Sequence, residues 1–118
     1  MPDNEIKVLL IEDDKDQALI IGKMLKVSRK ASFLINTTDT LTKGLQCIAK
    51  NDIDVILLDL TLPDSIGLDT FGRVHAHAPR TPIVIMTASD DDAQAKMALA
   101  KGAQDYLVKC NFDGNLLE

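Results

Sequence analysis

Short apolar runs alternate with amphipathic stretches along the whole chain. Five runs have the length and apolar content of buried strands, and they lie at residues 6–11, 31–36, 54–58, 81–87 and 105–108. The second run is the least apolar, which favours a place nearer the edge of a sheet. Val55 to Leu58 are apolar without interruption, which is typical of a central strand buried on both faces.

The stretches between these runs have the apolar spacing of helices. Residues 16–29 place Ala18, Ile21 and Leu25 on one face, and three more stretches repeat that pattern. A fifth helix would begin near residue 113, with only residues 114–118 left to form it. We expect Asp14 or Asp16 to cap the first helix, and Thr38 or Asp39 to cap the second, which ends at Asn51. Gly67 would begin the third helix, and Asp90–Asp92 and Gly102 would mark the start and the end of the fourth. Asp113 would cap the fifth.

This alternation of strands and helices predicts an α/β fold. Strands joined by helical crossovers form a parallel sheet with helices on both faces. The chain has 118 residues, which suffices for one domain with a real core and not for two. We expect a single domain over residues 1–118, the N-terminal part of a longer protein, because the last helix is incomplete at Glu118.

Composition and charge narrow the range of functions that the chain could have. The chain is 46% hydrophobic and 26% charged, with a net charge of −5, which disfavours binding to nucleic acid or to an anionic membrane. No apolar run approaches the roughly 20 residues of a membrane span, and the acidic N-terminus lacks the basic region of a signal peptide. We therefore expect a cytoplasmic protein, with Cys47 and Cys110 as unpaired thiols.

Polar residues follow the predicted strands at the points where the strands end. Glu12 and Asp13 follow the first strand, Asp59 the central one, Thr87 the fourth and Lys109 the fifth. In a parallel sheet these ends share one edge, where open α/β sheets bind their ligands. Carboxylates gathered there would repel one another unless a divalent cation lay between them. Oxygen ligands without histidine or cysteine favour Mg²⁺ or Mn²⁺.

A carboxylate beside such a metal, an ammonium group and a hydroxyl group is a suitable set for phosphoryl transfer. Asp59 would attack phosphorus, because carboxylates are known to form aspartyl phosphates. Lys109 would neutralise one phosphoryl oxygen and Thr87 would donate a hydrogen bond to another.

Four segments of the sequence now indicate a family. They are Leu-Leu-Ile-Glu-Asp-Asp at 9–14, Ile-Leu-Leu-Asp-Leu-Thr-Leu-Pro-Asp at 56–64, Ile-Val-Ile-Met-Thr-Ala at 83–88 and Asp-Tyr-Leu-Val-Lys at 105–109. In order and spacing the chain resembles a response-regulator receiver domain of two-component signalling. The resemblance implies a flavodoxin-like, doubly wound (βα)5 sandwich, with five parallel strands in the order 2-1-3-4-5 and a truncated last helix.

The resemblance also implies roles for individual residues. Asp59 would be the phosphoacceptor, and Mg²⁺ or Mn²⁺ would be held by Glu12, Asp13, Asp59 and the backbone carbonyl of Thr61. Lys109 and Thr87 would assist catalysis, and Thr87 and Tyr106 would form the switch. The donor would be a sensor histidine kinase or phosphotransfer protein, and the output a downstream effector, with no direct binding to nucleic acid or membrane. A homodimer is compatible with this interpretation. The domain would catalyse only its own phosphorylation and dephosphorylation.

One departure and three alternatives accompany this interpretation. Cys110 stands where the family usually has proline, so a cis bond after Lys109 would cost roughly 2.5–4 kcal/mol. A phosphohydrolase with an aspartyl nucleophile lacks room here for a substrate pocket. A flavin carrier would need a phosphate loop where this chain has three acids. The remaining alternative is a receiver-like binding module that is not phosphorylated. We interpret Asp90–Asp92 as charge that caps a helix.

Overall fold

The computed structural model describes residues 5–27, 32–87 and 92–109. The strands are β1 (Glu5–Ile11), β2 (Ser32–Thr38), β3 (Val55–Asp59), β4 (Thr61–Leu62), β5 (Ser65–Ile66), β6 (Ile83–Thr87) and β7 (Asp105–Val108). The helices are α1 (Lys15–Lys26), α2 (Leu41–Lys50), α3 (Leu68–His77) and α4 (Ala93–Ala100). The expected fifth helix and Cys110 lie outside the described residues.

Five strands form one parallel sheet in the order β2-β1-β3-β6-β7. This is the predicted order, since β6 and β7 are the fourth and fifth predicted strands. The sequence did not predict β4 and β5, which form a two-residue antiparallel ladder directly after β3. Strands this short leave no alternating pattern to detect.

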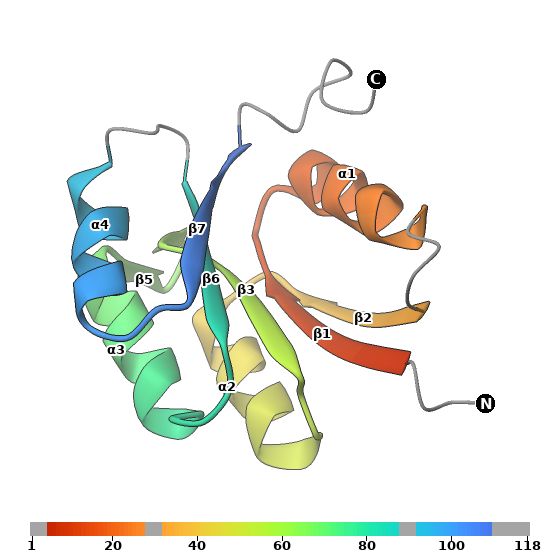
Figure 1. Cartoon of the computed structure of the whole chain (residues 1–118), viewed down its shortest axis with the longest axis horizontal. Helices are drawn as coiled ribbons and strands as arrows, with labels where there is room; N and C mark the ends of the chain where they lie inside the picture. The colour runs from red at the N-terminus through yellow and green to blue at the C-terminus, as the bar shows by residue number, and fades with distance from the viewer. Residues whose placement is uncertain (1–4, 28–31, 88–91, 110–118) are drawn as a thin grey trace.

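Helices cover both faces of the sheet. α1 lies on one side, and α2, α3 and α4 lie on the other (Figure 1). Successive residues of β1 divide between the two cores: Leu9 and Ile11 pack on the side of Phe71, and Val8 and Leu10 on the side of Ile21. This division follows from the two-residue repeat of a strand. Among the described helices, none is both long and apolar enough to span a bilayer.

The helix caps show where local sequence signals were sufficient. Asp14 caps α1 and Asp92 caps α4 as predicted, and Gly102 follows α4 with a φ of 123°. The predicted N-cap of α2 was wrong, because Thr40 takes that position in place of Thr38 or Asp39, whereas Asn51 ends the helix as predicted. The reason is the ladder with β1, which continues β2 through the pair Ile11–Thr38 and delays the helix.

Candidate functional site

The acidic segment after β1 begins the site. The backbone N–H of Glu12 donates to the carbonyl of Thr38 at 2.9 Å, which extends the β1–β2 ladder by one bond and fixes the segment. The Glu12 side chain turns inward and is only 2% exposed, whereas Asp13 is exposed. Asp14 accepts from the backbone N–H of Asp16 and of Gln17, which starts α1. The strand-to-helix turn therefore leaves one buried and one exposed carboxylate at the edge of the sheet.

Asp59 is the last residue of β3 and is 7% exposed. Its Oδ1 accepts a hydrogen bond of 2.9 Å from the backbone N–H of Thr61, the first residue of β4. The short β4–β5 hairpin thus turns the chain sharply after the strand and keeps the carboxylate at the surface of the site. Sequence reasoning located this carboxylate correctly, although the hairpin that orients it was not predicted.

Lys109 joins the two buried acids. Its Nζ lies 2.8 Å from Oδ2 of Asp59, 3.1 Å from Oε1 of Glu12 and 2.8 Å from Oε2 of Glu12. The lysine follows β7 at the sheet edge, two strands away from β3, so its long side chain crosses the end of β6 to reach them. The ammonium group offsets the repulsion that Glu12 and Asp59 would otherwise exert on each other.

Burial and proximity shift the protonation of this trio. The pKa of Glu12 is raised to about 7, chiefly by burial; Lys109 opposes this rise and the neighbouring Asp59 contributes to it. Burial lowers the pKa of Lys109, but its hydrogen bonds to Asp59 and Glu12 outweigh burial, so the net shift is upward. The lysine is therefore charged at neutral pH, whereas Glu12 gains and loses its proton near neutral pH.

Thr87 ends β6 and its hydroxyl is directed to the start of α4. The Oγ1 of Thr87 donates to Oδ2 of Asp92 at 2.5 Å, and Thr87 is 4% exposed. Asp92 Oδ1 accepts at the same time from the backbone N–H groups of Gln94 and Ala95, at 2.8 and 3.2 Å. These bonds, with that from Thr87 foremost, lower the pKa of Asp92 below its ordinary value.

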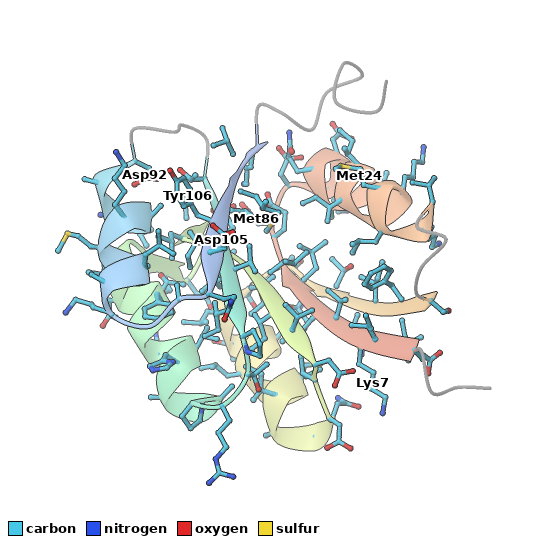
Figure 2. The ribbon with its side chains drawn as sticks, in the orientation of Figure 1. Lys7, Met24, Met86, Asp92, Asp105 and Tyr106 are labelled. Carbon is cyan, nitrogen blue, oxygen red and sulfur yellow. The ribbon has the colours of Figure 1, made fainter. Side chains whose placement is uncertain are left out.

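A cleft of about 350 Å³ contains all of these groups. Its lining residues are Glu12, Asp13, Asp14, Asp59, Leu60, Thr61, Met86, Thr87, Asp92, Gln94 and Lys109. The structure thus brings together every predicted site residue except Tyr106, which is half-buried on β7 and packs against the core on the side of Phe71 (Figure 2).

The sequence interpretation missed the roles of two acids, one that lines this cleft and one in the turn between β4 and β5. Asp92 was assigned only a capping role, yet it also holds Thr87. Asp64, in the turn between β4 and β5, accepts from the backbone N–H groups of Leu41 and Thr42 at 2.8 and 2.9 Å, and so caps α2 from a distance. Asp92 could have been suspected, because it lies only five positions after Thr87. Asp64 offered no such signal, because its partners lie more than twenty positions earlier.

The carboxylates fit a hard divalent cation. Glu12, Asp13 and Asp59 each offer an oxygen within 4.8 Å of the other two, as close as the ligands of one ion. Oε2 of Glu12 is buried and, apart from the ion pair with Lys109, has no hydrogen-bond partner. An oxygen-only set with an exposed member suits Mg²⁺ or Mn²⁺, which keep several waters.

Comparison with known proteins decides the family. Residues 8–118 match the response regulator receiver domain family. The chain belongs to that family. The cell cycle transcriptional regulator CtrA of Caulobacter vibrioides is 38% identical over 104 residues, which cover 88% of this chain and 44% of that protein. This receiver domain thus spans less than half the length of such a relative.

Solved receiver structures share the fold. A receiver domain protein from Clostridium thermocellum superposes with a TM-score of 0.76 at 27% identity, covering 88% of this chain and 82% of that one. The receiver domain of a sensor histidine kinase from Pseudomonas aeruginosa superposes with a TM-score of 0.75, covering 89% and 85%. At 24% identity the second likeness concerns the fold alone.

Proposed function

We propose that this receiver domain is a phosphorylation-dependent switch that accepts a phosphoryl group on Asp59. The observation that carries the proposal is the placement of that carboxylate. It lies at the end of a buried strand, in a cleft, with Lys109 2.8 Å away and Glu12 and Asp13 beside it. Charge of both signs around one carboxylate is what an incoming phosphoryl group requires. The donor in this proposal is a sensor histidine kinase or a phosphotransfer protein.

The transfer moves one phosphoryl group between two nucleophiles. A carboxylate oxygen of Asp59 forms a bond to phosphorus while the bond from phosphorus to the donor's histidine nitrogen breaks. The electron pair of the broken bond stays on the histidine. Lys109 stays protonated at neutral pH and neutralises a phosphoryl oxygen as it approaches. The residues contribute mainly position and charge.

Magnesium or manganese belongs to the same proposal. Glu12, Asp13, Asp59 and the backbone carbonyl of Thr61 would hold the ion, which when bound supplies positive charge against the acids and the phosphoryl oxygens. The acidic cluster supports this assignment. The Pseudomonas aeruginosa receiver domain was solved with a magnesium ion coordinated in its active-site cleft. We infer that the corresponding cleft of this chain binds the same ion.

The output step relies on Thr87 and Tyr106. In this proposal the Thr87 hydroxyl donates to a phosphoryl oxygen on Asp59, and Tyr106 changes rotamer as β6 and α4 adjust. Such a switch shifts a pre-existing equilibrium between two arrangements of one surface. A downstream effector reads that surface. The position of Tyr106 on β7, beside β6, supports this coupling.

Phosphorylation with a small-molecule donor tests the proposal. The purified domain is incubated with acetyl phosphate and Mg²⁺, and intact mass and peptide mapping locate the adduct. We expect one phosphoryl group on Asp59, none in Asp59→Asn, and wild-type behaviour in Asp69→Asn, an exposed acid in the first turn of α3. A folded wild-type domain that acquires no adduct would contradict the switch and favour the non-phosphorylated binding module.

A further inference from the structure

The hydroxyl group of Thr87 is already engaged in this structure. It donates to Oδ2 of Asp92 at 2.5 Å, while Oδ1 of the same carboxylate caps α4 through Gln94 and Ala95. The two oxygens of Asp92 therefore have separate tasks. One closes the first turn of a helix, and the other ties that helix to the end of β6. Figure 2 shows Asp92 at the start of α4.

A threonine hydroxyl has one proton to donate. While that proton is shared with Asp92, it cannot be shared with an oxygen on Asp59. Asp59 and Asp92 line the same cleft as Thr87, so an acceptor on either residue lies in the part of the molecule that the hydroxyl faces. A hydrogen bond to either an aspartate or a phosphoryl oxygen is charge-assisted and strong. The two acceptors therefore compete on comparable terms.

We infer that Asp92 is a positioning residue that retains the Thr87 hydroxyl in the unmodified protein and competes for it with a phosphoryl group on Asp59. The inference rests on the proposed function of Asp59. Modification draws the hydroxyl away from Oδ2 of Asp92 and removes this hydrogen bond between β6 and α4. The cap itself persists, because Oδ1 keeps its two backbone donors. Helix α4 is thereby freed to shift without unwinding.

Asp92 can act in this way only if the hydrogen bond from Thr87 to Asp92 and the one from Thr87 to the phosphoryl group have similar strengths. If Asp92 held the hydroxyl far more strongly than a phosphoryl group, modification would not reach α4. If it held the hydroxyl far more weakly, α4 would be released before any signal. Two charge-assisted bonds of similar strength leave both arrangements within reach of one ligand. Asp92 thus sets the threshold at which the phosphoryl group acts.

One substitution separates this role from simple capping. Asn is as good an N-cap as Asp, so in Asp92→Asn the amide oxygen can replace Oδ1. The amide NH2 group then occupies the position of Oδ2, where it can donate to Oγ1 of Thr87 but cannot accept the hydroxyl proton, which is left for another acceptor. Asp92→Ser offers a second route, because serine caps helices with a single oxygen. Amide exchange of Gln94 and Ala95 verifies that the cap survives in both variants.

The experiment is a double-mutant cycle read by beryllofluoride affinity in the presence of Mg²⁺. Beryllofluoride imitates the phosphoryl group on an aspartate. We expect Asp92→Asn to bind about tenfold more tightly than wild type, the equivalent of one charge-assisted hydrogen bond. In a Thr87→Val background the same substitution should change affinity far less. Loss of negative charge acts equally in both backgrounds, so the cycle removes its contribution.

The outcomes are distinct. An equal gain in both backgrounds, or weaker binding by Asp92→Asn, would overturn the role of Asp92 and leave the proposed function intact. No binding by wild type would overturn the proposed function, and this inference with it.

A measurement on the protein without any ligand completes the test. Scalar couplings that report χ1 of Thr87 should show one rotamer in wild type and averaging in Asp92→Ser, and one rotamer in both would contradict the inference.

Discussion

Lys109 Nζ lies 2.8 Å from Oδ2 of Asp59, fifty positions earlier in the chain, and equally close to Oε2 of Glu12. The ammonium group therefore pairs with two of the three carboxylates that we propose as metal ligands. In the absence of metal it is the main counter-charge for two buried acids. This double engagement leads to the first prediction.

We expect Lys109→Met to weaken the metal-free protein and to strengthen Mg²⁺ binding. Without the ammonium group, two carboxylates face each other, at a cost of about 1–3 kcal/mol in the free energy of unfolding. The freed oxygens then bind the metal without a competitor. Chemical denaturation with and without Mg²⁺, and calorimetric titration of Mg²⁺, measure both effects. Lys101→Met, an exposed lysine at the C-cap of α4, is the control. Weaker Mg²⁺ binding by Lys109→Met would contradict the prediction.

Glu12 predicts an unusual dependence of stability on pH. Its pKa is about 7 in the folded protein and near 4.5 ordinarily, so between these values the folded state retains a proton that the unfolded state has lost. The free energy of unfolding should therefore fall as pH rises from about 4.5 through 7. Denaturation of the metal-free domain across this range tests the sign. Glu12→Gln should flatten the slope, and Glu5→Gln, exposed on β1, should not. A slope that persists in Glu12→Gln would exclude Glu12 as its source.

Sequence analysis predicted the sheet, and the sheet edge at which the candidate residues gather, for one shared reason. The sequence of a strand buried on both faces is an unbroken apolar run, and a polar residue at its end marks the carboxyl edge of the sheet. Asp59 after Val55 to Leu58 is the clearest case. Once the strands are parallel, the edge gathers these residues whatever their separation in the chain.

The parts that were missed depend on long-range or very short structure. The N-terminus of α2 had three suitable caps in a row, and only the ladder between β1 and β2 selects Thr40. The β4–β5 hairpin has two residues per strand, too few for any periodicity. Asp64 caps α2 across 23 positions, and nothing local in the sequence indicates that contact.

Asp64 provides a prediction of its own. Hydrogen bonds from the backbone N–H groups of Thr42 and Leu41 lower its pKa to about 2. A carboxylate with a lowered pKa contributes stability that is present above its ordinary value of 3.8 and is lost as pH falls toward 2. Asp64→Ala should lower Tm by a few degrees at pH 7 and by less at pH 2.5. Thermal unfolding at the two pH values measures the difference.

A neighbouring acid supplies the control for Asp64. Asp39 is exposed, lies just before α2 and forms a surface ion pair with Lys43 of that helix at 3.0 Å. Surface pairs of this kind contribute little, so Asp39→Ala should leave Tm nearly unchanged. Equal losses in Asp39→Ala and Asp64→Ala would indicate a general charge effect at the start of α2. That result would contradict a specific tie between the β4–β5 turn and the helix.

Two helical glycines predict opposite effects of the same substitution. A Cβ at Gly22 of α1 would meet no atom within 4 Å, so Gly22→Ala should stabilise the protein by about 0.5–1 kcal/mol. A Cβ at Gly44 of α2 would lie 2.5 Å from Cδ1 and 3.0 Å from Cγ1 of Ile11, which is fully buried. Overpacking there should outweigh the gain in helix propensity, for a net loss of about 0.5–2 kcal/mol.

A double-mutant cycle locates the cause of the loss at Gly44. Ile11→Val deletes the Cδ1 atom and alone should cost about 0.5–1.5 kcal/mol. Combined with Gly44→Ala it should cost clearly less than the sum of the two, because each change makes room for the other. Denaturant unfolding of the four proteins measures the coupling. Additive losses would show that Gly44 is required for a reason other than Ile11. Since Ile11 precedes Glu12, crowding at this contact should also weaken Mg²⁺ binding, and Gly22→Ala should leave it unchanged.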